Sequence, residues 1–329
     1  MGPPKDDQIR GGPGLLVDDV YATFCEDLPV SLQRPAQDLA ASLGLSAPGV
    51  PWSRVFPHPF TLTVPGIVAD ASPLVDASVM RAAVVAHVMG LIQAVAMVRE
   101  ATGAVSATPQ VRRVLSAVRM AREQACGRLG GASFWAQGRF DLAIQQLELA
   151  LSVERACLGS AHSADWTTYE RIATAKQAVM LPAPLSLARE SRWRRDRREG
   201  LRRMITAIAL GLQLARDVME WEDDHARGGA WALALARGIA DADPDIEPQV
   251  GSVHSEVLES GILARLLRRA HESFQNGHEL AVALGLSRVA QWTSTQALAL
   301  ADLHRAEASF PGYAVRAAVL QAWAEEVLS

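Results

Sequence analysis

Apolar positions recur with a helical period along most of the chain, and no strongly alternating run indicates a strand. Alanine and leucine dominate these stretches, and both favour helices. Glycines and prolines separate one stretch from the next. The pattern predicts helices over residues 74–102, 109–129, 132–158, 164–181, 199–225, 229–240, 253–282, 286–305 and 311–328. We therefore expect an all-α fold in the form of one large helical bundle.

The amino-terminal part of the chain is less regular. Residues 1–14 are polar and rich in glycine and proline, which predicts a flexible tail followed by a single domain over 15–329. Several prolines between positions 46 and 65 predict loops and short helices there. The prolines of the segment 181–184 predict a break between two helices.

Composition narrows the class of protein. Of the 329 residues, 49% are hydrophobic, which is enough for a sizeable core, and the net charge of −4 gives no reason to expect a nucleic-acid partner. The three cysteines are far apart and form no metal-type pair, so a cytoplasmic location is expected. The most apolar stretch, 82–98, is shorter than the roughly 20 residues of a membrane span, so it predicts a core helix rather than a stable membrane span.

The segment ALGLQLARDVMEWEDDHARGG, residues 209–229, carries a stripe of carboxylates. Because an α-helix turns about 100° per residue, Asp217, Glu220 and Asp224 fall within about 60° of one another, and Gln213 shares their face. Three carboxylates on a largely buried helix are costly unless a cation neutralises them. Oxygen ligands of this kind suit Mg²⁺, so the spacing predicts a metal site on these three residues.

A solvated helix end is the alternative interpretation of this stripe. Glu222 and Asp223 point away from the other carboxylates and fit that interpretation. Acidic side chains near the carboxyl end of a helix oppose its dipole, however, which favours a functional reason for keeping them.

The segment RDVMEWEDDHARGG resembles the second aspartate-rich motif of the superfamily of class I terpene synthases and trans-isoprenyl diphosphate synthases, and is most similar to the bacterial large terpene synthases. Three other segments resemble the same group in the same order: HPFTLTVPGIVADA, SFWAQGRFDLAIQQLELALSVER and ATAKQAVMLP. Together they span about residues 55–235. The resemblance implies the isoprenoid synthase fold, Mg²⁺, a prenyl diphosphate substrate and dimerisation, either with itself or with an intact prenyl synthase.

The chain departs from the superfamily at the first aspartate-rich motif. HVMGLIQAVAMV stands in its place, with Ala94, Val95 and Val98 where the three aspartates belong. In the second motif, Arg216 replaces the first aspartate and Glu220 replaces the third. Half of the usual metal–diphosphate centre is therefore expected, with Asp217, Glu220 and Asp224 as both its catalytic residues and its metal ligands.

Positive charge can partly replace metal ions at a diphosphate. The resemblance makes Lys176 a diphosphate ligand, and Arg216 and Arg227 are further candidates. The basic run over 188–203 is either a solvated loop and helix start or a diphosphate clamp. Three side chains are predicted to line the pocket: Gln93, Val98 and Gln213.

Three hypotheses about function follow. The first is an unusual terpene synthase or prenyltransferase, which ionises a prenyl diphosphate before elimination, cyclisation or capture by a nucleophile. The second is a catalytically inactive prenyl-binding subunit or partner of an intact prenyl synthase, as the apolar residues at the first motif suggest. The third is acid–base chemistry on a neutral terpenoid, for which the sequence offers only the carboxylate stripe.

Overall fold

The computed structural model describes residues 13–56, 58–72, 75–159, 164–242 and 252–328, which form helices and no strand. The all-α prediction is therefore confirmed. The helices are α1 (Pro13–Glu26), α2 (Val30–Gln37), α3 (Leu39–Ser42), α4 (Trp52–Val55), α5 (Pro59–Asp70), α6 (Ala77–Ala101), α7 (Pro109–Gly127), η2 (Gly130–Ala132), α8 (Ser133–Gly159), α9 (Trp166–Lys176), η3 (Ala178–Met180), α10 (Pro182–Glu190), α11 (Arg195–Met219), α12 (Trp221–Ala226), α13 (Trp231–Ala242), α14 (Val253–Glu259), α15 (Ile262–Ala283), α16 (Ser287–Ser309) and α17 (Tyr313–Leu328).

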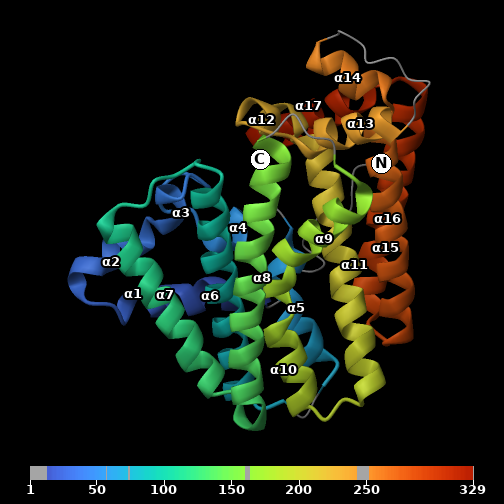
Figure 1. Cartoon of the computed structure of the whole chain (residues 1–329). Helices are drawn as coiled ribbons and strands as arrows, with labels where there is room; N and C mark the ends of the chain where they lie inside the picture. Colours follow the sequence, from blue (N-terminus) through green and yellow to red (C-terminus); the bar gives the residue numbers. More distant parts are fainter. Residues whose placement is uncertain (1–12, 57, 73–74, 160–163, 243–251, 329) are drawn as a thin grey trace.

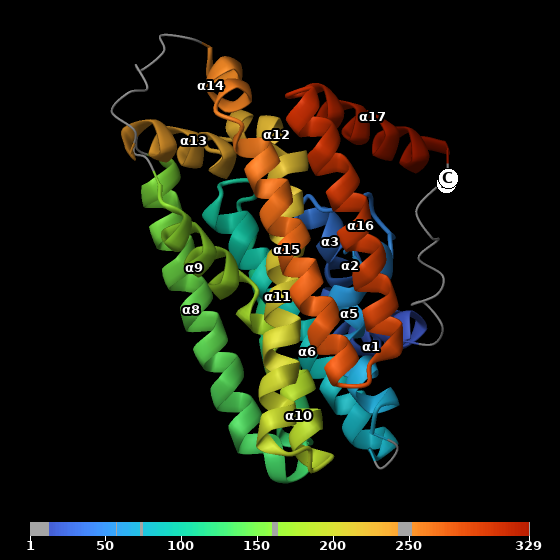
Figure 2. The same ribbon diagram turned by 90° about the vertical axis from the view of Figure 1, so that its right-hand side faces the viewer.

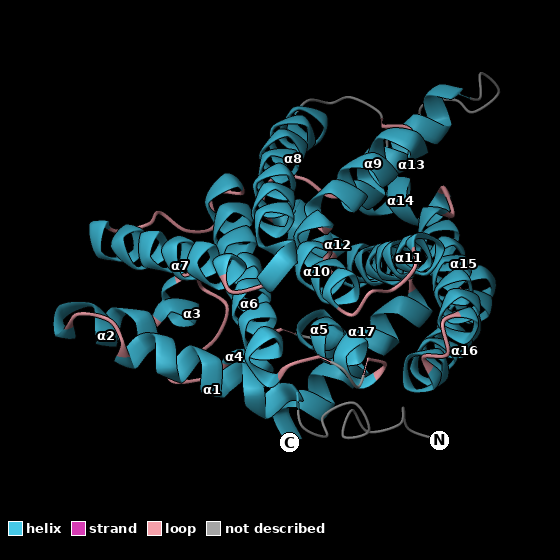
Figure 3. Ribbon diagram, turned by 90° about the horizontal axis from the view of Figure 1, so that it is seen from below, coloured by secondary structure: helices cyan, strands magenta, loops and turns pink. Residues whose placement is uncertain are grey.

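Five long helices, α6, α8, α11, α15 and α16, run along the length of the bundle (Figure 1). Helices α12, α13, α14 and α17 gather at one end of it, as the view turned by 90° also shows (Figure 2). Seen along the bundle, α11 lies between α10 and α15 (Figure 3), and it packs against both. The carboxyl end of α11 is thus at the end of the bundle where the shorter helices gather.

Helix α6 forms a central part of the core. Its buried residues include Val88, Met89 and Ile92, none of which exposes measurable surface. By length and composition alone α6 could cross a membrane, but 67% of its most apolar window is buried inside the fold. The prediction of a core helix over 82–98 is therefore confirmed.

Some helix boundaries differ from the sequence-based expectation. The segment 181–184 was expected to be a break, but α10 begins at Pro182, because proline is well tolerated in the first turn, where its missing N–H would be unpaired. Gly261, with a φ of 66°, divides the helix predicted over 253–282 into α14 and α15. Of the predicted tail, residues 1–12 lie outside the described residues, whereas Pro13 and Gly14 belong to α1.

Glycines bring α11 and α15 close together. A Cβ added to Gly211 of α11 would lie 2.8 Å from Cδ2 of the buried Phe274. A Cβ on Gly277 of α15 would lie 2.7 Å from Cγ1 of Ile208 in the same way. The small residues therefore set the distance between the two helices.

The substitution Gly211→Ala is expected to lower the free energy of unfolding by about 1–3 kcal/mol, because overpacking at a rigid ring strains the core. Gly138 of α8 provides the matched control, since a Cβ there would meet nothing within 4 Å. Gly138→Ala should raise the free energy of unfolding by about 0.5–1 kcal/mol. Urea denaturation measures both; an equal gain in the two variants would contradict the packing argument.

Candidate active site

Asp217 lies on the buried face of α11, near the carboxyl end of the helix, and is 4% exposed. The hydroxyl of Tyr169 donates a hydrogen bond of 2.6 Å to its Oδ2. Nε2 of Gln213, one helical turn earlier, donates one of 2.7 Å to its Oδ1. Burial raises the pKa of Asp217 to about 6, although the nearby ammonium of Lys176 and the two donors lower it in part. The fold thus keeps a carboxylate that is costly to ionise.

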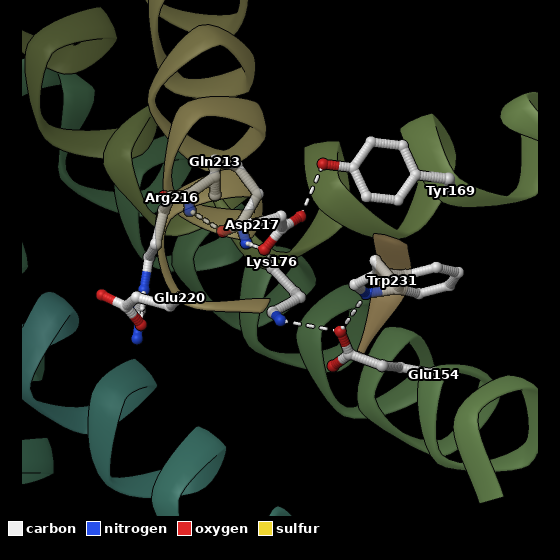
Figure 4. A network of polar contacts seen from close by, with 9 residues as sticks. Glu154, Tyr169, Lys176, Gln213, Arg216, Asp217, Glu220 and Trp231 are labelled. Carbon is white, nitrogen blue, oxygen red and sulfur yellow. Dashed lines mark hydrogen bonds and ion pairs between the residues drawn. The ribbon is translucent and has the colours of Figure 1, made fainter. Parts of the chain in front are cut away.

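A second buried pair lies beside Asp217 (Figure 4). Nζ of Lys176, at the end of α9, is 2.8 Å from Oε1 of Glu154 on α8. The indole Nε1 of Trp231 donates a hydrogen bond of 2.7 Å to the same oxygen. Only 15% of the Lys176 side chain and 10% of the Glu154 side chain are exposed. Gln177, which follows α9, joins these groups because its Nε2 donates a hydrogen bond of 3.1 Å to Oε1 of Gln213. Four helices, α8, α9, α11 and α13, therefore meet in one polar network, which we call the Asp217 network: Glu154, Tyr169, Lys176, Gln177, Gln213, Asp217 and Trp231.

The other two predicted ligands lie where α11 gives way to α12. Glu220 caps the carboxyl end of α11, and its Oε2 is 2.9 Å from Nε of Arg216. Oδ1 of Asp224, in α12, is 3.2 Å from Nη2 of Arg227. Burial raises the pKa of Asp224, and the guanidiniums of Arg227 and Arg216 offset part of that rise.

The three carboxylates do not form a common set of metal ligands in this arrangement. Asp217 accepts its hydrogen bonds from neutral side chains, whereas Glu220 and Asp224 each pair with an arginine. Across the described part of the chain, no three His, Cys, Asp or Glu side chains are grouped so that they could hold one ion. The helix break at Glu220 explains this, because the angular spacing expected of one continuous helix does not extend into α12.

The facing helix α6 presents no carboxylate at the positions of the first motif. Ala94 is buried, and Val95 and Val98 are half-buried, with Val98 packed against the core. Oε1 of Gln93 accepts a hydrogen bond of 2.9 Å from Nη1 of Arg122 on α7. Gln93 therefore forms a hydrogen bond with α7, and Gln213 forms one with Asp217. Two of the predicted pocket residues thus use their side chains to join parts of the protein in this arrangement.

Arg99, at the end of α6, adds positive charge to this region. Its Nε donates a hydrogen bond of 3.0 Å to the carbonyl of Leu43. Burial, followed by the nearby guanidiniums of Arg227 and Arg216, lowers the pKa of Arg99. Three arginines thus lie near one another beside the Asp217 network.

The basic run over 188–203 lies elsewhere. It spans the end of α10 and the start of α11, at the opposite end of the bundle from α12 (Figure 1). Arg198 and Asp217 are 19 residues apart (217 − 198) on α11, which corresponds to about 28 Å along the helix axis. The hypothesis that this run clamps a diphosphate bound at Asp217 is therefore wrong.

Sequence reasoning missed Tyr169, Glu154, Trp231 and Arg99. Tyr169 had a usable signal, because it precedes Lys176 by seven residues and so shares its helical face. The other three are distant in sequence from their partners; Trp231 and Glu154, for example, are 77 residues apart. Only the packing of the helices brings them together.

No known protein family matches the chain, and no curated protein is significantly similar to it in sequence. Among solved structures, it is similar to a polyprenyl synthetase from Streptomyces coelicolor A3(2), with a TM-score of 0.66 over 89% of this chain and 99% of that one. The chain has the isoprenoid synthase fold. At 13% identity the likeness establishes the isoprenoid synthase fold and not the activity.

Proposed function

We propose that this protein binds a prenyl diphosphate at the Asp217 network and ionises it. The observation that carries the proposal is a buried carboxylate, Asp217, close to the ammonium of Lys176, which itself pairs with Glu154, inside an isoprenoid synthase fold. Ionisable groups buried at a cost in stability are concentrated at functional sites. The location suits a substrate with a charged head and an apolar chain, because α8, which carries Glu154, packs against the apolar helix α6.

The cations would hold the diphosphate. Lys176, Arg216 and Arg227 all carry donors that match phosphate oxygens, and the two arginines can do so with two hydrogen bonds each. Arg216 and Arg227 are about half exposed, so they can turn from Glu220 and Asp224 to a ligand. In the reaction, the allylic C–O bond breaks and its electron pair leaves with the diphosphate, where these positive charges stabilise it.

The allylic cation would then lose a proton or be captured by a nucleophile. Asp217 is mostly ionised at neutral pH, because its pKa is about 6, and it can accept a proton. Glu220 and Asp224 would be freed as further carboxylates when their arginines move to the diphosphate. Mg²⁺ remains a prediction from the resemblance, and no step proposed here depends on it.

A second candidate function is a prenyl-binding subunit without catalysis, which would act as the partner of an intact prenyl synthase. It is favoured by the apolar residues Ala94, Val95 and Val98 on α6 and by the pairing of Glu220 and Asp224 with arginines. Such a subunit would bind the prenyl chain and leave its C–O bond intact.

Incubation of the purified protein with prenyl diphosphates of ten, fifteen and twenty carbons, with and without Mg²⁺, distinguishes the two candidates. Released diphosphate and extracted hydrocarbons or alcohols are measured. We expect diphosphate release from at least one substrate, and loss of the hydrocarbon formed by elimination in Asp217→Ala. Binding without release, together with stimulation of an added intact prenyl synthase, would support the subunit instead. Neither binding nor release would contradict both.

A further inference from the structure

A cavity of about 500 Å³ lies against α10, between α8 and the start of α11. This volume is typical of small-molecule sites, which range from about 300 to 1,000 Å³. The arginines that line the cavity at the start of α11 are separated from Asp217 by most of the length of that helix. The charged residues of the cavity are therefore different from those of the Asp217 network. None of Gln93, Val98 and Gln213 lines it.

The charge around the cavity is strongly positive. One acidic residue, Glu199, lines it and pairs with Arg202 at 2.5 Å. Five arginines share the lining: Arg139, Arg189, Arg195, Arg198 and Arg202. The first four form no ion pair with any described residue. One carboxylate cannot balance five guanidiniums, and the remaining like charges repel one another, so this arrangement favours an anionic ligand.

Trp135 orders two of these arginines. The guanidinium of Arg139, from α8, lies 5.3 Å from the ring centroid of Trp135, and that of Arg189, from α10, lies 6.0 Å from it. Such cation–π contacts restrict long side chains that would otherwise be mobile. Arginines from two helices therefore lie at one aromatic ring. Their planar guanidiniums are held in an orientation in which each can donate two hydrogen bonds to a phosphate.

Helix α11 adds backbone donors to the same place. Arg195 is its first residue, and no side chain caps its amino end. The first N–H groups of a helix have no partner within the helix and favour anions. Together with the arginine side chains, they favour an anion at this end of the cavity.

Apolar side chains line the rest of the cavity: Leu142, Ala143, Ala178, Leu181, Pro182 and Leu185. Leu142 is 41% exposed, so part of this apolar lining faces solvent. A small inorganic anion would leave this surface uncovered, whereas an attached hydrocarbon chain would cover it.

We propose that this cavity is a second ligand site, which takes an amphiphile with a phosphate or diphosphate head and an apolar chain. The head binds Arg139, Arg189 and Arg198, and the chain lies on Leu142, Leu181 and Leu185. The proposal does not depend on catalysis at Asp217.

Calorimetric titration with monomeric dodecyl phosphate tests the proposal, and inorganic diphosphate and dodecyl maltoside test the head and the chain separately. We expect dodecyl phosphate to bind at least tenfold more tightly than either. The double variant Arg189→Gln, Arg198→Gln should weaken this binding at least tenfold. Arg203→Gln is the matched control, because Arg203 is exposed on α11 beside Arg202 but does not line the cavity; it should bind as the wild type does.

A second double variant, Arg216→Gln, Arg227→Gln, shows whether the measured binding occurs at the cavity or at the Asp217 network. It should retain the binding of dodecyl phosphate at the cavity. Vesicles containing phosphatidic acid show whether the head is presented by a membrane or by a free compound. The proposal is overturned if neither monomeric dodecyl phosphate nor the phosphatidic-acid vesicles bind, or if inorganic diphosphate binds as tightly as dodecyl phosphate. It is also overturned if the Arg189→Gln, Arg198→Gln variant binds normally while its melting temperature shows it to be folded.

Discussion

Asp217→Asn is expected to make the folded chain more stable at neutral pH and to lower the yield of hydrocarbon formed by proton loss on the order of a hundredfold. Burial raises the pKa of Asp217 from 3.8 to about 6, and each pKa unit corresponds to about 1.4 kcal/mol. Ionised Asp217 therefore costs about 3 kcal/mol. The asparagine amide forms a poorer match to the donor on Gln213, so we expect a net gain of about 1–2 kcal/mol in the free energy of unfolding.

The dependence on pH identifies the cause of this gain. The folded chain keeps the Asp217 proton up to about pH 6, whereas the unfolded chain releases it near pH 4, so the contribution of Asp217 to stability falls as the pH rises through this window. The difference between Asp217→Asn and wild type should grow over the same window. Asp223→Asn, at an exposed position of α12, is the control and should show no such growth. A variant less stable than wild type at pH 7 would contradict this account of the site.

Lys176→Met is expected to lower the free energy of unfolding by about 3–5 kcal/mol, because it leaves the buried carboxylate of Glu154 without its cation. It also removes the cation that lowers the pKa of Asp217, so that pKa should rise further. Urea denaturation at pH 7 measures the loss. Turnover should fall as well, since Lys176 is proposed to hold the diphosphate.

The double variant Lys176→Met, Glu154→Gln separates stability from function. Without the Glu154 charge, most of the lost stability should return, because no unpaired ion remains at that position. Turnover should stay low, because the cation is still missing. If the single variant were as stable as wild type, or if the double variant recovered turnover, the role assigned to Lys176 would be wrong.

The fold was largely predictable because helical periodicity and the alanine- and leucine-rich segments are local signals. The start of α10 at Pro182 was not, since proline in a first turn looks like a break in the sequence. The division at Gly261 was missed because the residue adopts a left-handed conformation within an otherwise helical pattern.

The candidate site was predictable only within single helices. Helical spacing placed Gln213 and Asp217 on one face, and the structure joins them by a hydrogen bond. The same spacing did not place Asp217, Glu220 and Asp224 around one ion in the described part of the chain, because α11 ends at Met219. Tyr169 and Asp217 are 48 residues apart, and their contact depends on the packing of α9 against α11, which no local pattern encodes.

The central claim is that the Asp217 network holds the diphosphate of a prenyl chain through the cations around it. Titration calorimetry with an unreactive prenyl thiolodiphosphate of fifteen carbons tests it most directly. The chain used already carries Arg189→Gln and Arg198→Gln, so that binding at the second cavity is weakened at least tenfold. The account predicts one remaining binding event, weakened at least tenfold by adding Arg216→Gln and Arg227→Gln. No remaining binding, or binding that these two substitutions leave unchanged, would contradict it.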